Sequence, residues 1–293
     1  MVTIGAVGLR VAGWMRRQCP DRWVGVATSA IGDAAWLTQQ RRRRALADNM
    51  RRLTSDRGAQ DARRFARRTF RHLIRCNADL LAVPGASPAQ ILDTISVSGL
   101  GVIEEARRSG RGVLVVGAQL GNFELAAIGI AAIAGPASAL VESVNPDRDA
   151  VFSRLRTGTG LRLIAADARA PREALRVLRR GEVLIVAGDR LLQSGRSHLV
   201  PFARGRRPLP EGPAWLAVQS GAAVVTGYVV RTPGAMRPYA GVFESVLSTD
   251  DLGTEPVAML TTRIAERLGA AAMAYPDQWF VFDADWQDSE GAA

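Results

Sequence analysis

From about residue 93 onwards, the sequence alternates short apolar runs with longer helical patterns, and this alternation constrains the fold more than any other feature. Each apolar run is bounded by turn residues, which is typical of strands that are buried on both faces. Strands that alternate with helices predict a mainly parallel sheet covered by helices on both sides. The predicted strands are Thr94–Val97, Val113–Val116, Ser138–Val141, Leu161–Ile164, Val183–Ala187, Val224–Val230 and Val242–Val246.

The first 92 residues have a different pattern. They read as helix with little β-branched alternation, and breaks fall near Pro20, at residues 55–58 and at residues 84–85. We therefore predict an α/β protein, in which a three-layer α/β/α core formed by residues 93–293 follows an N-terminal helical arm formed by residues 1–92. A chain of 293 residues with 47% hydrophobic content can bury a sizeable core of this kind.

Positive charge is concentrated in the predicted helical arm. Residues 41–75 hold thirteen arginines against three aspartates, an excess equal to the net charge of +10 of the whole chain. Such a basic patch favours an anionic partner, which could be lipid head groups, nucleic acid or phosphorylated ligands. Nucleic acid is disfavoured because Phe65 and Phe70 are the only aromatic residues in the patch, so stacking platforms are scarce. We expect the patch to face an anionic membrane surface because of the segment that precedes it.

Residues 3–17 precede this patch and carry apolar side chains at helical spacing. The run is too short and too interrupted to span a bilayer, and no small-residue cleavage site follows it, so a signal peptide is not predicted. It fits an amphipathic helix lying in a membrane interface, and it also fits an ordinary helix that caps the core. The first alternative predicts a peripheral protein on the cytoplasmic side of the inner (plasma) membrane.

One segment carries the clearest chemical signal. The apolar run 112–117 is followed by the sequence Gln-Leu-Gly-Asn-Phe-Glu, which begins at Gln119, ends at Glu124 and forms a turn into a helix. In an open parallel sheet, ligands bind beyond the carboxyl ends of the strands. Gln119 and Glu124 are therefore predicted at the mouth of the sheet. Asp189 and Arg190 follow another strand end, and we expect them close to Gln119.

This arrangement resembles the H-x4-D/E signature of the bacterial glycolipid acyltransferase family, which includes lipid A and phosphatidylinositol mannoside acyltransferases. In this chain Gln119 stands where that family has its histidine. Other blocks resemble the family's and run in its order from about residue 97 to 279, and the D-R form at residues 189–190 resembles the phosphatidylinositol mannoside branch. These blocks are Asn145-Pro146 with Arg156 and Gly158, Gly181–Arg190, Gly195 with Pro201-Phe202 and Gly205, Gly212–Ala217, and Tyr275–Trp279.

The resemblance implies a transferase that moves a fatty acyl group to a glycolipid hydroxyl. Its donor would be an acyl-CoA or an acyl-carrier-protein thioester, and neither a metal nor a cofactor is implied. In the family the histidine acts as general base and the carboxylate orients its ring, which implies Gln119 and Glu124 as the catalytic pair here. The substrate-binding residues implied by position are Asn122, Arg156, Asp189 and Arg190.

Each of these residues also has a plainer structural interpretation. Glu124 can act only as a favourable charge at a helix N-terminus, and Asn122 can serve only the tight turn. Arg156 either holds a phosphate or polar group of the acceptor or is a charge on a helix surface. Asp189 and Arg190 either line the acceptor pocket or simply pair with each other.

The glutamine leaves the expected general base missing. An amide does not accept a proton near neutral pH, whereas an imidazole does, but Gln119 can still hold a substrate hydroxyl by hydrogen bonding. Glu124 is one candidate for a replacement base if burial raises its pKa. Of the two histidines, His198 lies in a predicted turn beyond Asp189 and is a second candidate, and His72 lies among arginines on a predicted helix.

Three functions therefore remain open. The first is acyl transfer at a membrane surface with an altered base. The second is a non-catalytic descendant that binds a lipid or regulates a partner protein. The third is a repurposed transferase that uses another donor or a soluble small-molecule acceptor.

Overall fold

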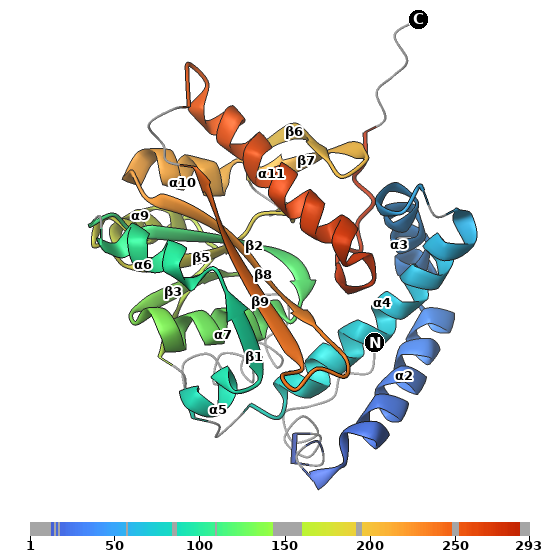
Figure 1. Ribbon diagram of the computed structural model, residues 1–293. Helices are drawn as coiled ribbons and strands as arrows, with labels where there is room; N and C mark the ends of the chain where they lie inside the picture. The colour runs from blue at the N-terminus through green and yellow to red at the C-terminus, as the bar shows by residue number, and fades with distance from the viewer. Residues whose placement is uncertain are drawn as a thin grey trace, which may run out of the picture.

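A computed structural model of the chain shows a seven-stranded mixed sheet with helices on both faces and a group of helices that precedes it (Figure 1). The predicted α/β class, the mainly parallel sheet and the preceding helices are confirmed. The structure describes residues 13–14, 16, 18–56, 58–83, 87–108, 110–142, 160–191, 195–247 and 252–287.

All seven predicted strands belong to this sheet. They are β1 (Ile95–Ser98), β2 (Val113–Gly121), β3 (Ala137–Val141), β4 (Leu161–Ala165), β5 (Val183–Ala187), β8 (Ala223–Arg231) and β9 (Tyr239–Leu247). The spatial order is β1-β9-β8-β2-β5-β3-β4, so β2 is the central strand. Every neighbouring pair is parallel except β8 and β9.

Helices cover both faces because the strands are apolar on both sides. Along β2, Val113 and Val115 pack in one cluster, whereas Leu114 and Val116 pack in another on the opposite face. The helices on the first face are α6 (Leu100–Arg108) and α7 (Phe123–Ala134), and those on the second are α9 (Ala170–Arg179), α10 (Gly212–Ser220) and α11 (Pro256–Ala274).

A two-stranded antiparallel hairpin lies outside the main sheet and packs against α11. It consists of β6 (Ser197–Phe202) and β7 (Gly205–Pro210). The prediction that His198 lies in a turn was wrong: residues 197–202 form β6, and the turn of the hairpin falls at residues 203–204. Pro201, Pro208 and Pro210 interrupt the strand pattern, but a two-stranded hairpin tolerates them because each strand keeps one unpaired edge.

The predicted N-terminal arm is helical and shares its core with the sheet. Trp36, Met50 and Phe70 pack in the same buried cluster as Leu120 and Trp279. One hydrophobic core therefore spans the boundary predicted between residues 92 and 93. The division into two domains at this point stays a prediction. The helices of the arm are α2 (Asp21–Thr38), α3 (Gln40–Leu53), α4 (Ala59–Leu80) and α5 (Pro88–Leu92).

Most of the predicted interfacial helix at residues 3–17 lies outside the described residues. Within its described part, Trp14 is exposed and Arg16 donates hydrogen bonds to Asp79 and Asp21. In the part of the chain that the structure describes, no helix combines the length and apolar character needed to cross a bilayer.

The contact between α2 and α4 depends on the close approach of their backbones at Gly32 and on the Asp33 carboxylate, which pairs with two arginines of α4. A Cβ atom on Gly32 would lie 2.7 Å from the Cα atom of Arg71, so glycine is needed there. The neighbouring Asp33 accepts two hydrogen bonds from Arg67 and two from Arg71. These hydrogen bonds hold the pKa of Asp33 well below its usual range. Part of the basic patch therefore pairs within the protein.

We expect Asp33→Asn to lower the melting temperature in a pH-dependent way. Because the pKa of Asp33 is depressed in the folded state, its stabilising contribution is present above the unfolded-state pKa of about 3.9 and is lost as the pH falls towards the folded-state value. Thermal unfolding of both proteins across this range should show a difference at neutral pH that shrinks below about pH 3.9. An equal difference at all pH values would contradict the assignment, and the exposed Asp93→Asn serves as the matched control.

Candidate active site

The register of the sheet brings two predicted site positions together. Gly117 of β2 pairs with Ala187 of β5, and Gln119 and Asp189 each lie two residues beyond that pair. The predicted proximity of Gln119 and Asp189 is confirmed, although the contact runs through the main chain of Gln119 and not through its side chain.

Asp189 is fully buried and acts as an acceptor for three hydrogen bonds. The main-chain N–H of Gln119 is shared between its two oxygens at 3.0 and 2.9 Å, and the indole Nε1 of Trp279 donates to Oδ2 at 2.8 Å. Burial raises the pKa of Asp189, while the Trp279 and Gln119 donors and the nearby Arg207 guanidinium lower it. The carboxylate therefore holds the end of β2 in place through the Gln119 N–H. Asp189 is not among the residues that line the cavity described below.

Arg207 supplies a positive charge that partly compensates the buried Asp189 carboxylate. Its guanidinium carbon lies 5.6, 5.1 and 5.4 Å from the ring centroids of Phe202, Trp279 and Trp286, and the residue is 1% exposed. Burial lowers the pKa of Arg207, and the attraction of Asp189 raises it. No sequence pattern marks Arg207, because its aromatic neighbours come from distant segments.

The turn after β2 is fixed by its main chain. The carbonyl of Gln119 accepts a hydrogen bond from the Phe280 N–H at 2.7 Å. Gly121 has a positive φ of 58°, and a Cβ atom there would lie 1.9 Å from the carbonyl oxygen of Val229, so no other residue fits. The main-chain conformation around Gln119 is thus fixed by the Phe280 hydrogen bond and by the close approach of Gly121 to Val229.

Asn122 caps α7 and is committed to that role. Its Oδ1 accepts a hydrogen bond from the Leu125 N–H at 3.2 Å, and its Nδ2 donates to the Cys76 carbonyl and to the Tyr239 hydroxyl. Tyr239 in turn donates to Asp79 at 2.7 Å. Asn122 is buried and is not among the residues that line the cavity.

A cavity of about 1220 Å³ opens at the carboxyl ends of the central strands, and Gln119 and Glu124 both line it. Both side chains are half-buried. On β2 the side chain of Gln119 faces the α7 side of the sheet, as Val115 does. On the α7 side of the sheet, a part that we call the inner chamber, the cavity is lined by Val115, Gly117, Ala127, Ile130, Ala139, Ile185, Ala187 and Phe243. On the α9 and α10 side it is lined by residues that include Leu140, Ala174, Val186 and Leu216.

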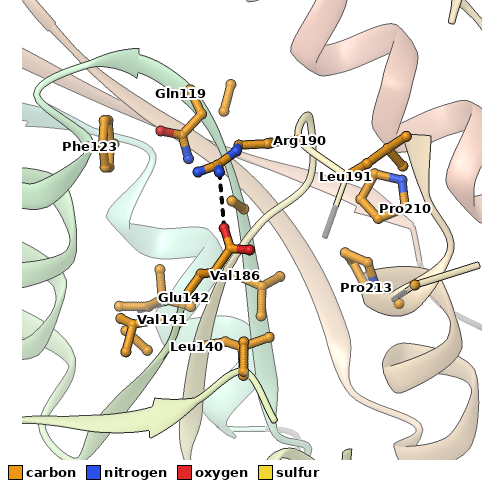
Figure 2. A pocket seen from close by; sticks show the side chains of 18 of the residues that line it. Gln119, Phe123, Leu140, Val141, Glu142, Val186, Arg190, Leu191, Pro210 and Pro213 are labelled. Atoms are coloured by element: carbon orange, nitrogen blue, oxygen red, sulfur yellow. Dashed lines mark ion pairs between the residues drawn. The ribbon is translucent and has the colours of Figure 1, made fainter. Parts of the chain in front are cut away.

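The rim of the cavity is charged. Arg190 pairs with Glu142, with 3.0 Å between Nη2 and Oε2. Figure 2 shows the guanidinium of Arg190 between the side chain of Gln119 and the carboxylate of Glu142. The partner of Arg190 is thus Glu142 and not Asp189.

Glu142 directly follows β3. The strand-end rule that predicted Asp189 as a site residue therefore also applies to Glu142. Arg41 and Arg42 of α3 line the cavity as well.

Arg156 lies outside the described residues, so its predicted contact with a phosphate or polar group stays a prediction.

Neither histidine lines the cavity in the described structure. His198 lies on β6 beside a separate hollow that Glu255 and Arg263 also line. His72 lies on α4 with Nε2 3.6 Å from Asp277 Oδ2, and burial lowers its pKa. Burial also raises the pKa of the Cys76 thiol to about 12, so that thiol stays protonated and inert. Glu124 is therefore better placed than either histidine to replace the missing base.

No group of three or more metal-binding side chains in the described ranges is arranged to hold a metal ion. The predicted independence from metals and cofactors stays a prediction.

Comparison with known proteins agrees with the resemblance of the motifs. Residues 3–288 match the family described as bacterial lipid A biosynthesis acyltransferase. A phosphatidylinositol mannoside acyltransferase of Mycolicibacterium smegmatis (strain ATCC 700084 / mc(2)155) is 24% identical over 211 residues. The similar region covers 70% of this chain and 66% of that relative, so the chain spans slightly less than two thirds of the relative's length.

We expect Asp189→Asn to lower the free energy of unfolding by about 3–5 kcal/mol, since it removes one member of a buried charged group and leaves an N–H donor without an acceptor. Urea unfolding of the variant and of the exposed control Asp93→Asn measures the difference. A loss below about 1 kcal/mol, the range of exposed ion pairs, would show that the buried carboxylate does not hold the end of β2.

Proposed function

This chain belongs to the bacterial lipid A biosynthesis acyltransferase family, and from that membership we propose that it transfers a fatty acyl group from a CoA or carrier-protein thioester to a glycolipid hydroxyl at a membrane surface. The observation that carries the proposal is the cavity with Gln119 and Glu124 at its mouth and an apolar inner chamber beneath them. A cavity with few polar groups at one end and apolar walls at the other suits an alkyl chain with a reactive head group.

The inner chamber is proposed to hold the acyl chain. Its walls between the sheet and α7 are apolar, and small side chains such as Ala187 and Ala139 leave the space open. With the chain in this position, the thioester carbonyl would lie near Gln119 and Glu124. The cationic groups of Arg190, Arg41 and Arg42 would then contact phosphate groups of the donor or the acceptor.

Glu124 is proposed as the proton acceptor. The hydroxyl oxygen of the acceptor attacks the carbonyl carbon of the thioester, a C–O bond forms, and the C–S bond breaks. The hydroxyl proton passes to the Glu124 carboxylate, and the donor leaves as a thiolate that then takes up a proton. Gln119 would hold the acceptor hydroxyl by hydrogen bonding, since its amide cannot accept the proton.

The same amide favours a second candidate, in which the protein binds a lipid without transferring an acyl group, or uses a different donor or acceptor. A positioned base contributes about 10²–10⁴-fold to the rate, so its loss can remove catalysis while the cavity keeps its ligand. The phosphatidylinositol mannoside named for the relative is the acceptor to test first.

We expect slow acyl transfer by the unmodified chain, measured with long-chain acyl-CoA and phosphatidylinositol mannoside in mixed micelles. Glu124→Gln should lower kcat/KM by about 10²–10⁴-fold, and Gln119→His should raise it within the same range, because an imidazole accepts the proton more readily. Glu105→Gln on the exposed surface of α6 is the matched control and should change nothing.

If the unmodified chain is inactive with every donor and Gln119→His is active, the non-catalytic candidate replaces the proposal. Activity that survives Glu124→Gln unchanged would remove Glu124 as the base.

We expect Ala187→Leu to reduce activity with long-chain donors much more than with short-chain donors. The side chain of Ala187 is exposed to the cavity on the α7 side of the sheet, so a leucine would narrow the path to the inner chamber. The profile of kcat/KM against donor chain length measures this effect, with Ala89→Leu on the exposed surface of α5 as control. An unchanged profile would place the acyl chain elsewhere.

A further inference from the structure

The outward face of α2 is apolar and has no partner among the described residues. On α2, Trp23 is 59% exposed and Leu37 is 68% exposed, and Val26 and Ile31 are also exposed. Figure 1 shows α2 on the outside of the molecule, with α4 between it and the sheet. The exposed large hydrophobic residues of the described chain are Trp14, Trp23, Val26, Ile31, Leu37, Trp215 and Met236, so most of them lie on the N-terminal helices.

The exposed side chains of α2 form one continuous stripe. Trp23, Val26, Ala30, Ala34 and Leu37 recur at spacings of three and four residues, which places them on one side of a helix. From Trp23 to Leu37 the stripe is about 21 Å long at 1.5 Å per residue.

The opposite face of α2 is also largely apolar. Val24, Gly32 and Trp36 are buried there and pack towards α4. A helix that is apolar on both faces is expected to be covered on both faces, and the described structure covers only one.

Arginines lie at both ends of the stripe. Arg22 lies over the ring of Trp23, with 5.8 Å between the guanidinium carbon and the ring centroid. Arg41 and Arg44 lie on α3, just beyond the last residue of α2. All three are exposed, and none has a carboxylate within ion-pairing distance in the described part of the chain.

An apolar stripe with a tryptophan and flanking arginines matches the surface of an anionic bilayer, in which a helix lies along the boundary between the acyl chains and the head groups. A second copy of the chain is less suited, because the arginines at the ends of two identical stripes would repel each other. The position of the stripe also suits the cavity. Arg41 and Arg42 at the start of α3 line it, so a bilayer that holds α2 would lie beside this part of the cavity rim.

We propose that the outward face of α2 is the membrane-docking surface of this protein, that Trp23, Val26, Ile31 and Leu37 insert among the acyl chains of an anionic bilayer, and that Arg22, Arg41 and Arg44 bind its head-group phosphates. The sequence pattern predicts this purpose for residues 3–17 and the whole basic patch, and it does not indicate α2. The inference deepens the proposed function, which needs a lipid acceptor, but it concerns binding and not the chemical step.

The test is co-sedimentation of the full chain with vesicles of phosphatidylcholine alone or mixed with phosphatidylglycerol. We expect binding to the mixed vesicles that weakens with salt. The double variant Val26→Asp/Leu37→Asp should reduce this binding by at least about tenfold, because it places two charges in the exposed stripe that would enter the bilayer. Met236→Asp is the matched control, since Met236 is 101% exposed on a loop far from α2 in sequence.

The proposal would be overturned if the α2 variant and the unmodified protein bound the mixed vesicles equally and had the same melting temperature. The proposal would also be overturned if light scattering showed that the unmodified protein is a dimer and that the same substitutions make it a monomer. The stripe would then be the contact with a second copy of the chain. Because the assay needs no turnover, failure of membrane docking and failure of acyl transfer can be told apart.

Discussion

The site depends first on the buried carboxylate of Asp189. It ties together three segments that are far apart in sequence: the end of β2 through the Gln119 N–H, the end of β5 on which it lies, and the C-terminal segment through the Trp279 indole. A buried carboxylate is costly unless its hydrogen bonds and charge are compensated. Here three hydrogen bonds and the Arg207 guanidinium, held among aromatic rings, provide that compensation. The result is a rigid strand end from which the side chain of Gln119 reaches the cavity.

A second polar network extends this rigidity to the N-terminal helices. Asn122 at the start of α7 bonds to Tyr239, and Tyr239 bonds to Asp79 of α4, which also accepts hydrogen bonds from Arg75 and Arg231. The start of α7, which carries Glu124, is therefore fixed to α4 as well as to the sheet. α2 packs on α4 through Asp33 and Gly32. A protein docked to a membrane through α2 would thus hold the mouth of its cavity in a defined position relative to the lipid.

Much of the architecture was predictable, because it is encoded in local patterns. The apolar runs located all seven strands of the main sheet, and the rule that ligands bind at the carboxyl ends of parallel strands located Gln119 and Glu124 at the cavity. The partners of Asp189 and Asn122 were not predictable. Whether a polar residue at a strand end faces a cavity or the interior depends on donors such as Trp279, ninety residues away. The exposed stripe of α2 was missed for a related reason: a helix that is apolar on both faces gives no sign in sequence of which face is left uncovered.

The proposed function requires that the inner chamber beside Gln119 holds the acyl chain of a thioester donor. The most direct measurement is a crystal structure of the chain with a non-hydrolysable thioether analogue of a long-chain acyl-CoA. We expect the alkyl chain to lie between β2 and α7, in contact with Val115, Ala139 and Ile185. The group that replaces the carbonyl should then lie beside Gln119 and Glu124. An alkyl chain bound outside this chamber, with Gln119 and Glu124 away from the sulfur, would contradict it.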